Sequence, residues 1–140
     1  MRIITPDSLA IATIWQEAAG EPYEGKIAVA AVIRNRMNKK YQSDGTVEGT
    51  VLADYQFSGW NTDTKDTLRE RSMRLDDTDP VVQECQMAWR ESEMRDPTRG
   101  SVLYFAPKGA KKIPYWASAE GVKLAVVIKN HQFYTDGDAV

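Results

Sequence analysis

The most constraining feature of this sequence is a run of seven apolar residues from Ile27 to Ile33, within a segment that is apolar on nearly all sides if it is helical. Pro22 precedes the segment, and proline suits the start of a helix because its missing N–H is not needed there. We therefore predict a helix over Tyr23–Asn38. A helix without a polar face is stable in water only when other elements surround it, so the rest of the chain has to cover this one.

Two further helices are predicted from their end signals. Thr5-Pro6-Asp7 combines an N-cap, a proline at the first helical position and an acid in the first turn. The helix that follows is expected to run from Pro6 to Ala19, with Gly20 as its stop. Asp79-Pro80 repeats the start signal, and the third helix is expected to reach about Met94.

The remaining segments predict loops and a few strands. Residues 41–78 are polar and turn-rich, which favours a loop or small-hairpin region over a site. Residues 102–106 and 132–134 are expected to be strands, and 124–128 fits either a strand or a helix. The fold class is therefore α+β, with helices dominant.

Length, charge and composition exclude several kinds of function. A chain of 140 residues predicts one domain spanning 1–140. Its 18 basic and 20 acidic residues give a net charge of −2, whereas nucleic-acid binding usually needs a basic excess. One cysteine and one histidine permit neither an internal disulfide nor a zinc site built from Cys and His alone, and we expect no metal and no cofactor.

The sequence also carries an expectation about the membrane. No apolar run approaches the roughly 18 residues that span a bilayer. The polar segment Thr5-Pro6-Asp7-Ser8 interrupts the start of what could be a signal peptide, and no cleavage site follows. We expect synthesis in the cytoplasm without a conventional export signal, and no membrane insertion.

Three glutamates crowd the junction between the first two predicted helices. Glu21 and Glu24 fit surface acids at a helix N-terminus, where the helix dipole favours anions. Glu17 lies in a last turn, where the same dipole disfavours a carboxylate, and burial beside Trp15 or the charge of Glu21 would raise its pKa further. Glycosidic bond cleavage requires such a protonated acid. Glu17 is therefore a catalytic candidate, with a surface acid as the alternative.

Other reactive residues have simpler interpretations. His131 is the lone histidine, and a hydrogen-bonded structural role is favoured over that of a base. Cys85 falls on the apolar stripe of the third helix and is expected in the core. The acid cluster at 76–79 lacks the spacing of a calcium loop and is expected to cap that helix. Some aromatic residues of loop-like segments could stack on sugar rings, namely Phe57, Trp60 and Trp116.

Several segments together resemble the SleB-type cell wall hydrolases, the spore cortex-lytic family that is also common in phages. In chain order they are Gln16–Gly25, Ile27–Met37, Gln56-Phe57-Ser58, Asp96–Gly100, Leu103–Phe105 and Ile128–Tyr134. Each match is short, but the ordered set spans most of the chain. The sequence departs from the family pattern where Gln16 and Lys129 each replace a glycine and where Ala19 replaces an arginine.

The resemblance implies a mainly helical, lysozyme-like α+β domain with a small antiparallel sheet. It implies cleavage of the MurNAc–GlcNAc β-1,4 bond of peptidoglycan by Glu17 acting as acid and then base. The enzyme would be a lytic transglycosylase that leaves 1,6-anhydro-muramic acid ends. Glu21 would support Glu17 from behind or contact the substrate, and the groove wall would be formed by Phe57, Ser58, Tyr104, Asn130, His131 and Tyr134.

Two alternatives stay open. A hydrolytic muramidase would use water and a second acid, for which Asp44, Asp54, Asp63 and Asp66 are candidates. A peptidoglycan-binding or virion structural module would keep the fold without the activity. The small size and missing export signal fit a phage lysin that is carried in the virion or released through a membrane pore made by a partner protein.

Overall fold

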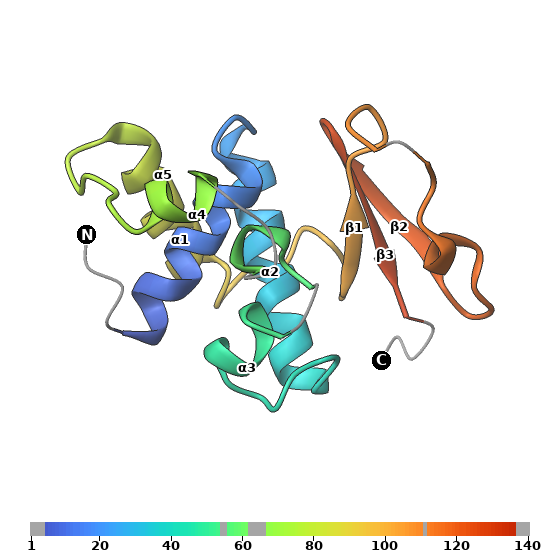
Figure 1. Ribbon diagram of the computed structural model, residues 1–140. Coiled ribbons are helices and arrows are strands. Elements are labelled where there is room, and N and C mark those ends of the chain that lie inside the picture. Colours follow the sequence, from blue (N-terminus) through green and yellow to red (C-terminus); the bar gives the residue numbers. More distant parts are fainter. Residues whose placement is uncertain (1–4, 54–55, 62–66, 111, 137–140) are drawn as a thin grey trace.

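The computed structural model describes residues 5–53, 56–61, 67–110 and 112–136. Helices form one side of the molecule and a three-stranded sheet forms the other, with helix α2 (Tyr23–Lys39) at the boundary between them (Figure 1). Within the described residues, no helix is both long and apolar enough to cross a bilayer.

Helix α2 is the buried centre that the sequence predicts, and it ends one residue later than expected. The side chains of Val29, Ala30 and Ile33 pack in one core cluster with residues of the neighbouring helices. Those of Ala28 and Val32 pack with Phe133 of the sheet in a second cluster. The helix is therefore covered from both sides, as its apolar surface requires.

Helices α1 (Pro6–Ala18) and α5 (Pro80–Glu91) pack against α2 and against each other, and both begin where predicted. At α1, the Thr5 hydroxyl accepts a hydrogen bond from the Ser8 backbone N–H at 3.1 Å, in a capping box. At α5, the Asp79 carboxylate accepts from the Val81 N–H at 2.8 Å, so the acid cluster does cap the helix. Each helix ends slightly before its predicted end.

The core position of Cys85 is confirmed. Its side chain is fully buried in the cluster between α1, α2 and α5. Burial raises the pKa of the Cys85 thiol to about 12, so the thiolate that a nucleophile needs does not form near neutral pH.

The prediction of a loop or hairpin over 41–78 is wrong for the part of this region that the structure describes. The chain there forms helical turns: α3 (Val47–Val51), η1 (Ser58–Trp60) and α4 (Thr67–Ser72). Thr46 caps α3 by accepting from the Gly49 N–H at 2.9 Å. The indole N–H of Trp60 donates to the Thr13 hydroxyl of α1 at 2.9 Å, which fixes η1 on that helix.

The sheet is antiparallel, with strands in the order β1 (Leu103–Phe105), β3 (His131–Thr135), β2 (Lys123–Ile128). Residues 124–128 are thus a strand, and the α+β class is confirmed. Tyr104 pairs with Phe133, and Ile128 pairs with His131 across a two-residue turn. Because side chains alternate along a strand, Tyr104, His131 and Phe133 share the face toward the helices.

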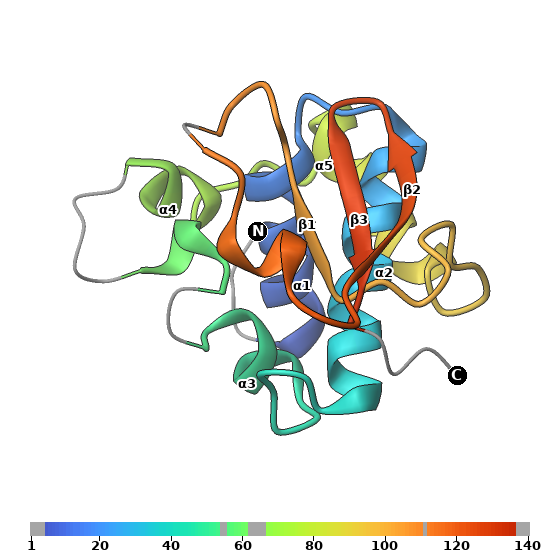
Figure 2. The same cartoon turned by 90° about the vertical axis from the view of Figure 1, so that its right-hand side faces the viewer.

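Between β1 and β2 the chain crosses the outer face of the sheet, where it forms the short helix η2 (Tyr115–Ser118) (Figure 2). Trp116 of η2 contacts the rings of Phe105 and Tyr134, with centroids 5.9 and 5.2 Å away. Both faces of the sheet are therefore packed along part of their length.

Candidate active site

The candidate site lies where the end of α1 meets the helix-facing side of the sheet. Glu17 is the second-last residue of α1, and its side chain is partly buried. The phenol O–H of Tyr104, from β1, donates a hydrogen bond to Glu17 Oε1. Among the described residues no group hydrogen-bonds Glu17 Oε2, so this oxygen is available to carry a proton toward a substrate.

Burial is the main influence on the Glu17 carboxyl. It raises the pKa above the ordinary 4.5, while the Tyr104 hydrogen bond and the charge of Arg36 act in the opposite direction. The position of Glu17 in the last turn of α1, at the negative end of the dipole, also favours the protonated form. The net result is a carboxyl that holds its proton to higher pH than an exposed glutamate does.

Tyr104 is a permanent donor to this carboxyl. Burial and the adjacent Glu17 charge raise the pKa of its phenol well above 10, so the O–H keeps its proton. Its hydrogen bond stabilises the carboxylate form of Glu17, which would arise after proton donation. The sequence predicts Tyr104 as a groove wall, and the structure makes it the direct partner of Glu17.

Arg36 is a charged neighbour of Glu17, and the sequence alone suggested no role for it. Its side chain is 4% exposed, its Nε donates to the Val102 carbonyl at 2.7 Å, and its Nη1 donates to Gln56 Oε1 at 3.0 Å. It follows Val29 and Val32 at the helical spacing of the buried face, so a cation on that face was the available signal. Its charge favours the ionised form of Glu17 and so limits the effect of burial.

Glu21 forms a second group with two residues of the β2–β3 hairpin. Asn130 donates to Glu21 twice, from its backbone N to Oε1 at 3.3 Å and from Nδ2 to Oε2 at 2.8 Å. His131 Nδ1 lies 3.4 Å from Glu21 Oε1. These contacts join the α1–α2 junction to the hairpin turn, which lie side by side at the same end of the molecule in both views (Figures 1 and 2).

The pair formed by Glu17 and Tyr104 contacts the group formed by Glu21, Asn130 and His131 through two aromatic rings. The rings of Tyr104 and His131 are in edge-to-face contact, with centroids 5.2 Å apart. Burial lowers the pKa of His131 and the Glu21 charge opposes this, so the imidazole is held toward its neutral form. We expected Glu21 to raise the pKa of Glu17 by its charge. In the structure Glu21 contacts Asn130 and His131 instead, and burial, which we also expected, is the main cause of the raised pKa.

Two of the predicted wall residues, Phe57 and Tyr134, have different positions from those expected, whereas Ser58 stays a candidate. Phe57 is 1% exposed and belongs to the main core cluster, so its ring is unavailable to a substrate. Tyr134 is 9% exposed and lies on the outer face of the sheet under Trp116, away from Glu17. Ser58 is exposed in η1, which packs on α1 beside the site.

Of the four acids proposed as partners of Glu17, the structure describes only Asp44, which is used in its own turn. Asp44 accepts hydrogen bonds from the Thr46 N–H and hydroxyl at 2.9 and 2.6 Å, in the turn before α3. Asp54, Asp63 and Asp66 lie outside the described residues. In the part of the chain that is described, no three His, Cys, Asp or Glu side chains converge as they would around a metal ion.

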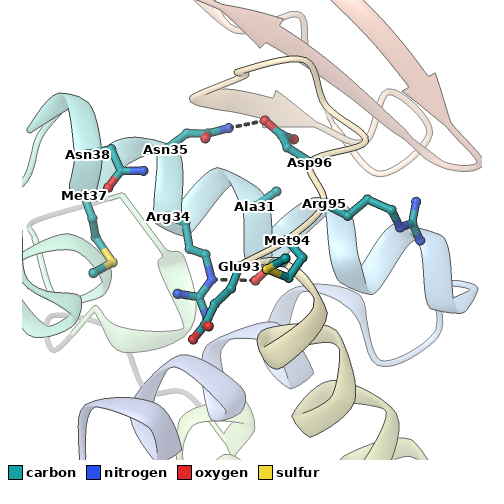
Figure 3. Close-up of a pocket in the computed structure, with 10 residues that line it drawn as sticks. Ala31, Arg34, Asn35, Met37, Asn38, Glu93, Met94, Arg95 and Asp96 are labelled. Carbon is teal, nitrogen blue, oxygen red and sulfur yellow. Dashed lines mark hydrogen bonds and ion pairs between the residues drawn. The ribbon is translucent and has the colours of Figure 1, made fainter.

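A separate hollow of about 380 Å³ lies between α2 and the segment after α5 (Figure 3). Its polar groups are used in packing. The Arg34 guanidinium stacks 3.6 Å from the Trp89 ring centroid and donates to Ser92 Oγ at 2.6 Å. Asn35 Nδ2 donates to Asp96 Oδ2 at 2.9 Å. These bonds attach α5 and the segment after it to α2, and we assign no ligand to the hollow.

A glutamate whose pKa is raised by burial, at the junction of a helical layer and a small sheet, defines a site suited to acid catalysis. The profile of the Cell Wall Hydrolase family matches residues 20–134, and the chain belongs to this family. The SleB-type resemblance seen in the sequence motifs is thereby confirmed. The matched region begins at Gly20, three residues after Glu17.

Individual relatives agree with this assignment. The chain is 31% identical over 106 residues to a spore cortex-lytic enzyme of Oceanobacillus iheyensis, a match that covers 74% of this chain and 33% of the relative. The chain thus corresponds to about a third of that protein.

Two solved structures share the fold. The catalytic domain of the germination-specific lytic transglycosylase SleB from Bacillus anthracis is 24% identical, with a TM-score of 0.66 over 91% of this chain and 92% of that one. The catalytic domain of the Bacillus cereus SleB protein is 26% identical, with a TM-score of 0.64 over 91% and 88%.

The hydrogen bond between Tyr104 and Glu17 leads to a prediction about pH. The bond favours the ionised carboxyl, so Tyr104→Phe should raise the pKa of Glu17 further. The basic limb of the kcat/KM profile for cell-wall cleavage should then move to higher pH. The matched control is Tyr115→Phe, at an exposed tyrosine of η2, which should leave the profile in place. An unchanged or lowered limb in Tyr104→Phe would contradict this geometry.

The raised pKa of Glu17 also predicts a pH-dependent stability. The folded state binds this proton more tightly than the unfolded chain does, so stability from Glu17 is complete below about pH 4.5 and is lost as pH rises through the folded pKa. Glu17→Gln removes that loss. Its melting temperature should match the wild type at low pH and exceed it increasingly toward neutral pH.

The control for stability is Glu48→Gln, at an exposed glutamate of α3. Thermal melts of the three proteins from pH 4 to pH 8 make the comparison. A constant difference between Glu17→Gln and wild type across this range would show that the Glu17 proton is not held by folding.

Proposed function

We propose that this protein is a peptidoglycan lytic transglycosylase that cleaves the MurNAc–GlcNAc β-1,4 bond of glycan strands. The observation that carries the proposal is the Glu17 carboxyl, whose pKa is raised by burial and which is held by Tyr104 through one oxygen only. Membership of the Cell Wall Hydrolase family supports the substrate class. The name of the structural relative from Bacillus anthracis supports the type of reaction.

In the proposed reaction, Glu17 acts twice. Its protonated Oε2 donates to the glycosidic oxygen as the bond from that oxygen to C1 of MurNAc breaks. The carboxylate then takes the proton of the C6 hydroxyl of the same MurNAc, whose oxygen bonds to C1 and closes a 1,6-anhydro ring. No water is consumed. Glu17 ends protonated again, with the proton of the C6 hydroxyl in place of the one it gave to the leaving oxygen.

The neighbouring residues support the two halves of this cycle differently. Burial keeps the carboxyl protonated for the first half, and the Tyr104 hydrogen bond and Arg36 charge stabilise the carboxylate for the second. Glu21 is hydrogen-bonded by Asn130 and lies beside His131, and it would shape the groove rather than act on C1. Among the described residues Glu17 is the one candidate for the reactive carboxyl, which favours attack by the substrate's own hydroxyl over attack by water.

The products of digestion distinguish the two reactions. Purified peptidoglycan digested with this protein should yield fragments that end in 1,6-anhydro-muramic acid, without new reducing ends, when analysed by mass spectrometry. Fragments with reducing muramic acid would replace the transglycosylase with a hydrolytic muramidase and leave the glycosidase assignment in place.

The role of Glu17 is tested on the same substrate. Glu17→Gln keeps the shape of the side chain and removes the transferable proton, so cleavage should fall by at least about 10³-fold. Glu48→Gln serves again as the control and should cleave like the wild type. A Glu17→Gln protein that is folded by circular dichroism and still cleaves at a near wild-type rate would rule out this mechanism and favour a different catalytic residue.

A further inference from the structure

The outer face of the sheet carries two adjoining hollows that the proposed reaction does not use. They measure about 230 and 250 Å³ and share Pro107 and Gln132 as lining residues. Val127 lines the first and is 53% exposed, and Ile113 lines the second and is 72% exposed. This face is turned toward the viewer in Figure 2, with η2 covering only part of it.

Lysines surround these hollows. Lys108 and Lys129 line the first, and Lys112 lines the second. All three are exposed, and none makes a hydrogen bond or ion pair with another described residue. Five of the nine lysines in the sequence fall between residues 108 and 129, where Glu120 is the only acid, although the whole chain has a net charge of −2. The face is therefore locally cationic and suited to an anionic ligand.

Lys129 occupies a backbone position that favours glycine. It is the first of the two residues in the β2–β3 turn, with φ at +52°. A left-handed conformation is strained for a residue with a Cβ, and such residues persist where the surroundings require them. A role of the Lys129 side chain in the first hollow, which it lines, would explain why a lysine is present where glycine would be less strained.

One residue connects the first hollow with the candidate active site. Asn130 lines it and, through its backbone N and Nδ2, holds the Glu21 carboxylate on the helix side. The turn residues 129 and 130 thus connect the two faces of the sheet at the end where Glu21 lies. If a branched glycan strand binds at Glu17, one of its side branches could extend over this turn.

We propose that these hollows and their lysines, Lys108, Lys112 and Lys129, bind the free carboxylates of the peptide stems that branch from peptidoglycan. This inference rests on the proposed function, because it assumes a glycan strand at Glu17. Short peptides with several carboxylates match the charge of the face. The exposed Val127 and Ile113 provide apolar contacts for the alanine methyl groups of such stems.

The test compares one substitution on two substrates. Soluble glycan strands with intact stems are the first substrate, and the same strands with stem carboxylates converted to amides by carbodiimide and ammonia are the second. Lys129→Gly removes the charge and suits the turn backbone, so the fold and melting temperature should be kept. Its KM for the acidic strands should rise by about 3–10-fold at low salt, with kcat little changed.

On the amidated strands, wild type and Lys129→Gly should have the same KM. Added salt should reduce the difference on the acidic strands, because these charges are exposed. The matched control is Lys40→Gly. Lys40 has almost the same conformation, with φ at +53°, but lies at the other end of α2, about 25 Å of helix away, and its loss should leave KM unchanged.

Three other results would contradict the stem-binding inference or the proposed function. An unchanged KM in Lys129→Gly on acidic strands that the wild type cleaves would overturn the stem-binding inference and leave the proposed function intact. An equal rise on both substrates would also overturn it, because the turn backbone rather than the carboxylates would then matter. A wild type that cleaves neither substrate would refute the proposed function itself, and the inference with it.

Discussion

The arrangement of this molecule depends on the burial of helix α2. Its central residues, from Ile27 to Ile33, are almost completely inaccessible to solvent. Helices α1 and α5 cover one side and strand β3 covers another, because no single layer can enclose a helix that is apolar all round. The candidate site lies where these two layers meet, with Glu17 supplied by one and Tyr104 by the other.

That junction explains the chemistry of Glu17. The same packing that encloses α2 removes water from the carboxyl and raises its pKa, against the opposing effects of Tyr104 and Arg36. The positive charge of Arg36 lowers the pKa of Glu17. The carboxyl can hold its proton to higher pH only because the effect of burial is larger than the effect of this charge. Tyr104 and Arg36 nevertheless stabilise the carboxylate form of Glu17 once the proton has left. The pKa is thus raised within limits, as a group that both donates and accepts a proton requires.

The sequence predicts the helices well because their signals are local. Thr5, Asp79 and the proline after each of them mark two helix starts correctly, and the apolar run identifies α2. Glu17 could be singled out from its place at a helix end. By contrast, the alternation of a short strand does not say which face lies toward the helices, and Tyr134, predicted as a groove wall, lies on the outer face of the sheet.

Other errors have the same origin in long-range packing. Phe57 follows a polar, turn-rich stretch, and nothing near it in the chain indicates that it enters the main core. Asn130 and His131 approach Glu21 from more than 100 residues away. Arg36 was recognisable only as a charge on a buried helical face, and its connection to Glu17 required the fold.

The central claim is that folding keeps the Glu17 carboxyl protonated above the range of an ordinary glutamate. The most direct measurement is the ¹³C chemical shift of the Glu17 carboxyl followed by NMR through a pH titration of the folded wild-type protein. Assignment of the signal is made by its absence in Glu17→Gln. The account predicts a titration midpoint above 4.5, the ordinary value for glutamate. A midpoint at or below that value would contradict it.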